Sequence, residues 1–221
     1  MQLSLRTKIP FGIVSKGLTY LLLAGVVFFA GQFITQFATT QPYSMRTEAI
    51  SDLGITKCGT YPEYITKQTF KLCSPLHLVM DATFVMYGAL IMLGVSLGLR
   101  FVWPVAKFRK VGLALLFFGG IEAVVAGFSP LDLAPVLHRI SGGFAIGALD
   151  LGLVLLGTGI RKTRFGVFTL VTGALGIFGF LMDGKTSAGL GYGGWERVAG
   201  YAAAVWFIAA GFYLRRLTVK R

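Results

Sequence analysis

The chain has 221 residues, of which 55% are hydrophobic and only 14% are charged, and its mean hydropathy is +0.72. A soluble domain has about a quarter of its residues charged, so this composition argues against a water-soluble enzyme. The 21 basic and 9 acidic residues give a formal net charge of +12, and the positions of the basic residues along the chain explain this excess.

Six long stretches of the sequence are almost free of charge, and each can cross about 30 Å of hydrocarbon as a helix. A helix is favoured because it satisfies its own backbone hydrogen bonds in lipid. The predicted fold class is therefore an all-α membrane protein with six transmembrane helices in a single domain, residues 1–221. We expect the spans at residues 17–39, 76–99, 111–129, 137–160, 165–182 and 196–214.

The basic residues are distributed unequally between the two sides of these spans. Four flanking segments hold 14 of the 21 and none of the acidic residues, which by the positive-inside rule places both termini in the cytoplasm. We expect a multi-pass protein of the cell (inner) membrane, with anionic lipids attracted to its cytoplasmic face. Nucleic acid is not an expected partner, because these short flanks lack interleaved aromatic residues. The 14 residues are Arg6, Lys8, Lys16, Arg100, Lys107, Arg109, Lys110, Arg161, Lys162, Arg164, Arg215, Arg216, Lys220 and Arg221.

The one long polar segment, residues 41–74, follows the first span and is predicted to be an extracytoplasmic loop. It contains both cysteines of the chain, Cys58 and Cys73. Two cysteines in one extracytoplasmic loop predict a disulfide, which would be worth on the order of 3 kcal/mol. The alternative is two unpaired thiols.

Ionisable residues within or beside the spans are the candidates for function. Such groups are costly in lipid and usually face the interior of a bundle or a cavity. All but Asp150 belong to the outer half of the predicted bundle. We expect Asp81, Glu122 and His138 to project into one cavity as acid–base, catalytic groups, with Asp52 or Arg139 at its mouth. Candidate ligand-binding residues are Ser51, Asp52, His77, Arg139 and Arg197, of which the two arginines suit a phosphate or carboxylate.

Each of these residues also has a structural interpretation. Glu196 fits best as a residue that caps or flanks a helix start, and Arg139 can extend to the headgroups. Asp150 can be a protonated carboxyl group or can pair across the bundle. A metal site is a further alternative, because two histidines and two aspartates form a nitrogen and oxygen set suited to zinc. The sequence does not establish that these four meet, so the cofactor is left unknown; they are His77, Asp81, His138 and Asp52.

Three short motifs resemble a known family. They are Ile50-Ser51-Asp52-Leu53-Gly54 after the first span, Gly127-Phe128-Ser129-Pro130 followed by His138, and Gly194-Trp195-Glu196-Arg197 before the last span. Together they resemble the prokaryotic integral membrane family named domain of unknown function 998, over roughly residues 17–215. Asp81 stands where that family often has asparagine. The resemblance implies a six-helix membrane protein with a polar site on the outer side, and it implies no activity.

The sequence leaves three functions open. The first is a site that binds or hydrolyses a lipid-like amphiphile at the outer leaflet. The second is a structural or accessory membrane subunit without catalysis, whose internal charges only hold helices together. The third is a proton-coupled transporter of small solutes, with Glu122 and Asp150 as a proton relay. Whether the protein is an enzyme is left undecided at this point.

Overall fold

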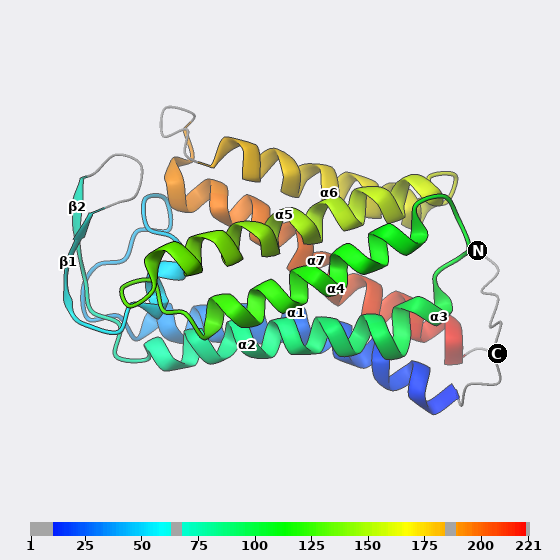
Figure 1. Cartoon of the computed structure of the whole chain (residues 1–221), viewed down its shortest axis with the longest axis horizontal. Helices are drawn as coiled ribbons and strands as arrows, with labels where there is room; N and C mark the ends of the chain where they lie inside the picture. The colour runs from blue at the N-terminus through cyan, green and yellow to red at the C-terminus, as the bar shows by residue number, and fades with distance from the viewer. Residues whose placement is uncertain (1–10, 63–67, 184–188, 220–221) are drawn as a thin grey trace.

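The computed structural model describes residues 11–62, 68–183 and 189–219. This part of the chain contains six helices that are long and apolar enough to cross a membrane, and they run side by side (Figure 1). The predicted all-α membrane fold is therefore confirmed. The helices are α1 (Phe11–Phe37), α2 (His77–Gly94) continued by a π-helical turn η2 (Val95–Leu99) and by α3 (Arg100–Val102), α4 (Arg109–Gly127), α5 (Pro135–Gly159), α6 (Arg164–Met182) and α7 (Gly191–Val219).

The first and last helices begin earlier than the hydropathy pattern indicates. Helix α1 begins at Phe11 and includes Lys16, and α7 begins at Gly191, so that Glu196 lies in its second turn. The predicted ends of the spans were placed at charged residues. A helix, however, continues for as long as its backbone N–H and C=O groups form hydrogen bonds within the helix. A charged side chain near a helix end can reach polar surroundings without ending the helix.

The six spans form a closed ring in chain order. Each packs mainly on its neighbours in sequence, and α7 closes the ring by packing on α1. Small residues permit close approach at the crossings. A Cβ at Gly98 would lie 2.7 Å from the backbone of Gly17 and of Leu18, and a Cβ at Gly120 would lie 2.9 Å from the carbonyl oxygen of Gly88. The unusual glycine content of the chain thus serves helix–helix contact.

One end of the bundle, which we call the hairpin end, carries most of the polar connections. It holds the 3₁₀ turn η1 (Ser51–Gly54) and the strands β1 (Gly59–Pro62) and β2 (Thr69–Leu72). The strands are antiparallel, with Gly59 opposite Leu72. Cys58 and Cys73, which flank the two strands, form a disulfide, so the predicted bond is confirmed. Residues 63–67 lie outside the described residues.

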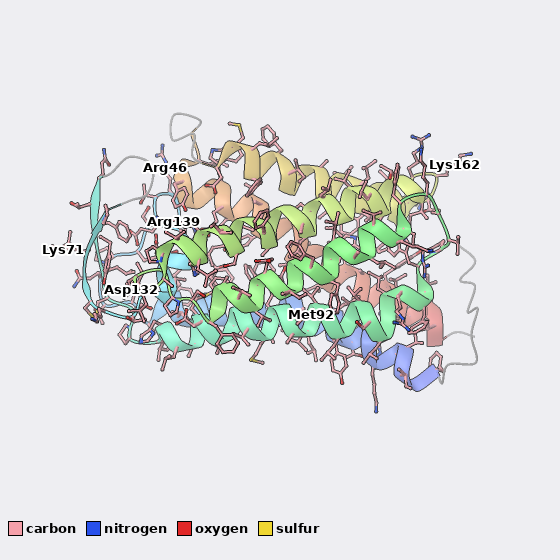
Figure 2. The ribbon with its side chains drawn as sticks, viewed as in Figure 1. Arg46, Lys71, Met92, Asp132, Arg139 and Lys162 are labelled. Carbon is pink, nitrogen blue, oxygen red and sulfur yellow. A yellow bond between two sulfur atoms is a disulfide. The ribbon has the colours of Figure 1, made fainter. Side chains whose placement is uncertain are left out.

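The start of α1 and the end of α7 lie together at the opposite end of the bundle (Figure 1). That end also carries the described basic residues that set the predicted orientation, among them Lys162 (Figure 2). Arg6, Lys8, Lys220 and Arg221 lie outside the described residues. The structure thus places the polar loop and the basic flanks at opposite ends. Which end faces the cytoplasm stays a prediction.

Candidate functional site

A cavity of about 380 Å³ lies inside the ring of helices at the hairpin end. All six spans and η1 contribute to its wall, so the cavity follows the axis of the ring. Its polar lining residues come from η1, from the start of α5, from the end of α6 and from the start of α7. They are Ser51, Asp52, His138, Arg139, Asp183, Tyr192 and Glu196, and Tyr87 of α2 also lines the cavity. Apolar residues such as Phe28, Phe84, Leu149 and Phe180 line the remainder.

His138 is placed by the first turn of α5, which begins with Pro135 at a position where a proline favours helix initiation. The side chain is buried, and its Nδ1 lies 2.7 Å from the carbonyl oxygen of Ser129 and 3.1 Å from that of Ala126. Both partners are acceptors, so Nδ1 carries a proton. In the neutral imidazole Nε2 is then the acceptor. His138 therefore offers the cavity a base with a defined tautomer.

Asp52 lies in η1 and also lines the cavity. Its Oδ2 accepts a hydrogen bond of 2.7 Å from the backbone nitrogen of Ala49, which fixes the carboxyl group within its own loop. Burial raises the pKa of Asp52 to about 8, and the nearby Glu196 and Glu48 act in the same direction. The carboxyl group is therefore predominantly protonated at neutral pH and presents a hydrogen-bond donor and no charge.

Glu196 and Arg197 begin the second turn of α7 and hold the loop before η1 against it. The Oε2 of Glu196 accepts a hydrogen bond of 2.5 Å from the backbone nitrogen of Ile50. Nη1 of Arg197 donates to the carbonyl oxygens of Met45, Glu48 and Gly193 at 2.8–2.9 Å. Helix α7 thus positions η1, and with it Asp52, at the cavity.

Arg197 was expected to bind a ligand, and the structure places it differently. Its guanidinium group is buried, and Nη2 donates to the hydroxyl of Tyr43 at 2.6 Å. This hydroxyl in turn donates to the carbonyl oxygen of Ala49 at 2.5 Å, and burial raises the pKa of Tyr43. Arg197 does not line the cavity. Its contacts are those of a residue that holds a loop.

Arg139 follows His138 on α5, is exposed and lies at the hairpin end (Figure 2). It belongs to the wall of the cavity. Ser51 precedes Asp52 in η1 and is buried at the wall of the same cavity. These two candidate ligand-binding residues therefore lie beside His138 and Asp52. The structure brings four of the predicted site residues to one cavity.

Asp81 and His77 lie together but do not line the cavity. Nδ1 of His77 is 3.7 Å from Oδ2 of Asp81, as their spacing on one face of α2 predicts. Asp81 packs against η1, since a Cβ at Gly54 would lie 2.5 Å from Oδ1 of Asp81. Asp81 supports the turn that carries Asp52 without itself lining the cavity.

Glu122 is also absent from the cavity wall, although its neighbour Ala123 belongs to it. Glu122 is half-buried on α4, and it has no hydrogen bond or ion pair with any residue that the structure describes. One helical position turns a side chain by about 100°, so Ala123 faces the ring axis and Glu122 does not. The expected meeting of Asp81, Glu122 and His138 in one cavity is thus not found.

The four residues considered for zinc do not gather either. Within residues 11–62, 68–183 and 189–219, no group of three or more histidine, cysteine or acidic side chains could hold a metal ion. His77 and Asp81 form a pair on α2, whereas His138 and Asp52 face the cavity. The donor set proposed from the sequence is divided between two places.

Four polar residues of the cavity wall are not among the predicted site residues, and they are Tyr87, Asp183, Tyr192 and Glu196. Glu196 was interpreted as a helix flank, and it does bind a backbone nitrogen, but it also lines the cavity. Tyr192 lies one turn earlier on the same face of α7. The i, i+4 spacing of the two is the signal that could have identified them, had the start of the helix been placed at Gly191.

A ring of six apolar helices around a partly polar cavity defines a multi-pass membrane protein. The chain belongs to the family described as Protein of unknown function (DUF998), whose match covers residues 22–213. The resemblance seen in the three motifs is therefore confirmed. No curated protein and no solved structure matches the chain.

Proposed function

We propose that the cavity binds a lipid-like amphiphile that carries an anionic headgroup and enters from the outer leaflet. The observation that carries this proposal is the division of the cavity wall. Hydrogen-bonding groups from η1, α5 and α7 lie at the hairpin end, and aromatic and aliphatic side chains line the remainder. A mostly apolar pocket with a few convergent polar groups is the usual form of a small-molecule site.

The polar end combines one basic residue, Arg139, with the acidic residues Asp52, Asp183 and Glu196. Arg139 supplies a cation that suits a phosphate or a carboxylate. Asp52 is predominantly neutral at pH 7, because burial raises its pKa to about 8, so it does not repel an anionic headgroup. Nε2 of His138 can accept a hydrogen bond from a hydroxyl group of the ligand.

The same arrangement permits hydrolysis as the finer form of the proposal. A base with a fixed tautomer can take a proton from a water molecule that attacks an ester, and His138 has that form. The 380 Å³ of the cavity corresponds to about a dozen water molecules at ~30 Å³ each. It therefore suits a headgroup and part of one chain better than a complete two-chain lipid.

Thermal stability in a neutral alkyl maltoside tests the proposal, with a single-chain lysophospholipid as the probe. A ligand at a hundred times its Kd stabilises the folded state by about 2.7 kcal/mol. We expect the probe to raise the Tm of the wild-type protein and to do so less for Arg139→Gln.

A pair of glycine variants provides the matched control. Gly142 lines the cavity and Gly12 lies near the start of α1, and a Cβ at either position meets nothing within 4 Å. Gly142→Leu fills the cavity and should abolish the stabilisation, whereas Gly12→Leu should retain it. Equal stabilisation of both variants would refute binding in the cavity. If the probe raises the Tm of neither the wild-type protein nor any of the variants, the result favours a structural or accessory membrane subunit without a ligand site.

A further inference from the structure

Asp150 is a buried carboxyl group that the proposed amphiphile site does not use. It lies on α5, one residue after Leu149 of the cavity wall, and its exposed fraction is 0%. Neither oxygen has a hydrogen-bond partner among the residues that the structure describes. A carboxylate left in this state inside a membrane is strongly disfavoured.

Helix α6 is shaped to receive this side chain. A Cβ at Gly176 would overlap the carboxyl group of Asp150, and a Cβ at Gly173 would lie 2.7 Å from its backbone oxygen. The carboxyl group therefore lies directly on the backbone of α6. Any side chain at position 176 would overlap the carboxyl group of Asp150, so this position requires a glycine while Asp150 occupies that space.

No charged side chain of the described residues acts on the carboxyl group. Gly173 and Gly176 face it from α6, and α4 brings Gly119 against the neighbouring Leu149. On α7 the indole of Trp206 donates to Thr169 of α6. Tyr87 of α2 is a titratable group within electrostatic reach of Asp150. A metal ion would need several oxygen ligands, which these neighbours do not supply.

Access to Asp150 differs between the two ends of the bundle. Leu149, the residue before Asp150 on α5, lines the cavity, and so does Tyr87, which lies within electrostatic reach of Asp150. Toward the opposite end, α5 buries Leu153 and Leu156, and beyond them Trp103, Phe165 and Trp206 pack together with ring centroids 5.9–6.3 Å apart.

We infer that Asp150 is a proton-binding site that is occupied at neutral pH and exchanges its proton with the cavity, past Tyr87. The opposite end is closed by apolar and aromatic packing, so the site is reached from one side only. This inference is independent of the amphiphile proposal, and it replaces the relay through Glu122 with a one-sided site.

Carbon-13 NMR of the protein in lipid, labelled at the aspartate carboxyl carbon, tests the occupancy. The chain has five aspartates, and Asp→Asn variants at the other four assign the Asp150 resonance by elimination. An Asp150→Asn variant, which could fail to fold, is therefore not needed. The four other positions are Asp52, Asp81, Asp132 and Asp183. We expect the Asp150 resonance at the carboxylic acid position at pH 7. Free aspartate in the same buffer at pH 7 gives the carboxylate reference. An Asp150 resonance at the carboxylate position would overturn the inference.

Transfer to deuterated buffer tests the route. The Asp150 resonance should show the deuterium isotope shift, and Gly142→Leu, which fills the cavity, should slow its appearance relative to Gly12→Leu. Equal rates in the two variants would overturn access through the cavity. Lysophospholipid binding could fail while both of these results hold, so the outcomes of the two proposals are distinguishable.

Discussion

Carboxyl groups at the hairpin end are held in two different ways. Asp132 lies in the α4–α5 connection, and its oxygens accept hydrogen bonds of 3.1 and 2.7 Å from the backbone nitrogen and hydroxyl of Thr56. Asp52 accepts one backbone hydrogen bond and is otherwise surrounded by protein. Thr56 therefore holds both oxygens of Asp132, whereas burial favours the neutral form of Asp52.

This difference predicts a pH dependence of stability that comes from Asp52. Its pKa in the folded protein is about 8, against 3.8 for the unfolded chain, so the folded state binds more protons between these values. The stabilisation is complete below pH 3.8 and is lost as pH rises through 8. Relative to Asp52→Asn, the wild-type free energy of unfolding should fall by up to about 1.4 kcal/mol per pH unit. Denaturation curves measured between these pH values check it, and parallel curves would contradict it.

Arg197 should matter for stability rather than for ligand contact. Arg197→Lys keeps the charge but cannot reproduce the four hydrogen bonds to Met45, Glu48, Gly193 and Tyr43. Because a hydrogen bond to a charged group is worth about 1.5–3 kcal/mol, we expect a loss of about 3 kcal/mol in the free energy of unfolding.

Arg46→Lys is the matched control for this variant, since Arg46 is exposed in the loop that Arg197 contacts (Figure 2). Its effect should stay within about 0.5 kcal/mol. Thermal melts in detergent give both values. A similar small effect at both positions would show that the hydrogen bonds of Arg197 contribute little.

At the scale of elements, helix crossings depend on glycines that touch backbone. Alanine at position 98 gains up to about 1 kcal/mol in helix propensity, but its Cβ would lie 2.7 Å from backbone atoms of Gly17 and Leu18, which cannot move aside as a side chain does. Overpacking of this kind costs about 1–3 kcal/mol, so the penalty should exceed the gain. Gly98→Ala is expected to lower the Tm and Gly142→Ala is not, as thermal melts can show.

The elements themselves could be predicted because hydropathy alone identifies a span, and the cysteine positions identified the disulfide. An ionisable residue at the start of an apolar stretch indicated His138, and its place in the outer loop beside the spans indicated Asp52; both line the cavity. The rotation of each helix about its axis could not be predicted. Gly54 and the end of α4 set the face that α2 turns to the ring axis, and that packing directs Asp81 to η1 instead of to the cavity. Such long-range contacts leave no signal in a single sequence.

At the scale of the whole molecule, the two ends of the bundle predict its orientation. The hairpin end carries Cys58 and Cys73, and the opposite end carries basic side chains such as Lys162. By the positive-inside rule the hairpin end faces away from the cytoplasm. A phosphatase reporter that is active only outside the cytoplasm should stay inactive when fused at the C-terminus. If that fusion is active, the protein has the orientation opposite to the predicted one.

The closed ring also sets an order of assembly. Neighbouring spans can pair as they leave the ribosome, because their contacts are local in sequence, but α7 must find α1 across the whole length of the chain. The same docking step brings Glu196 to the backbone of Ile50 and Tyr201 to Gln32 of α1. Before it, the backbone N–H of Ile50 beside η1 lacks its acceptor, Glu196 of α7, and the cavity lacks one wall. The cavity therefore forms only when α7 has docked, and a nascent chain stalled before α7 would lack this enclosed space.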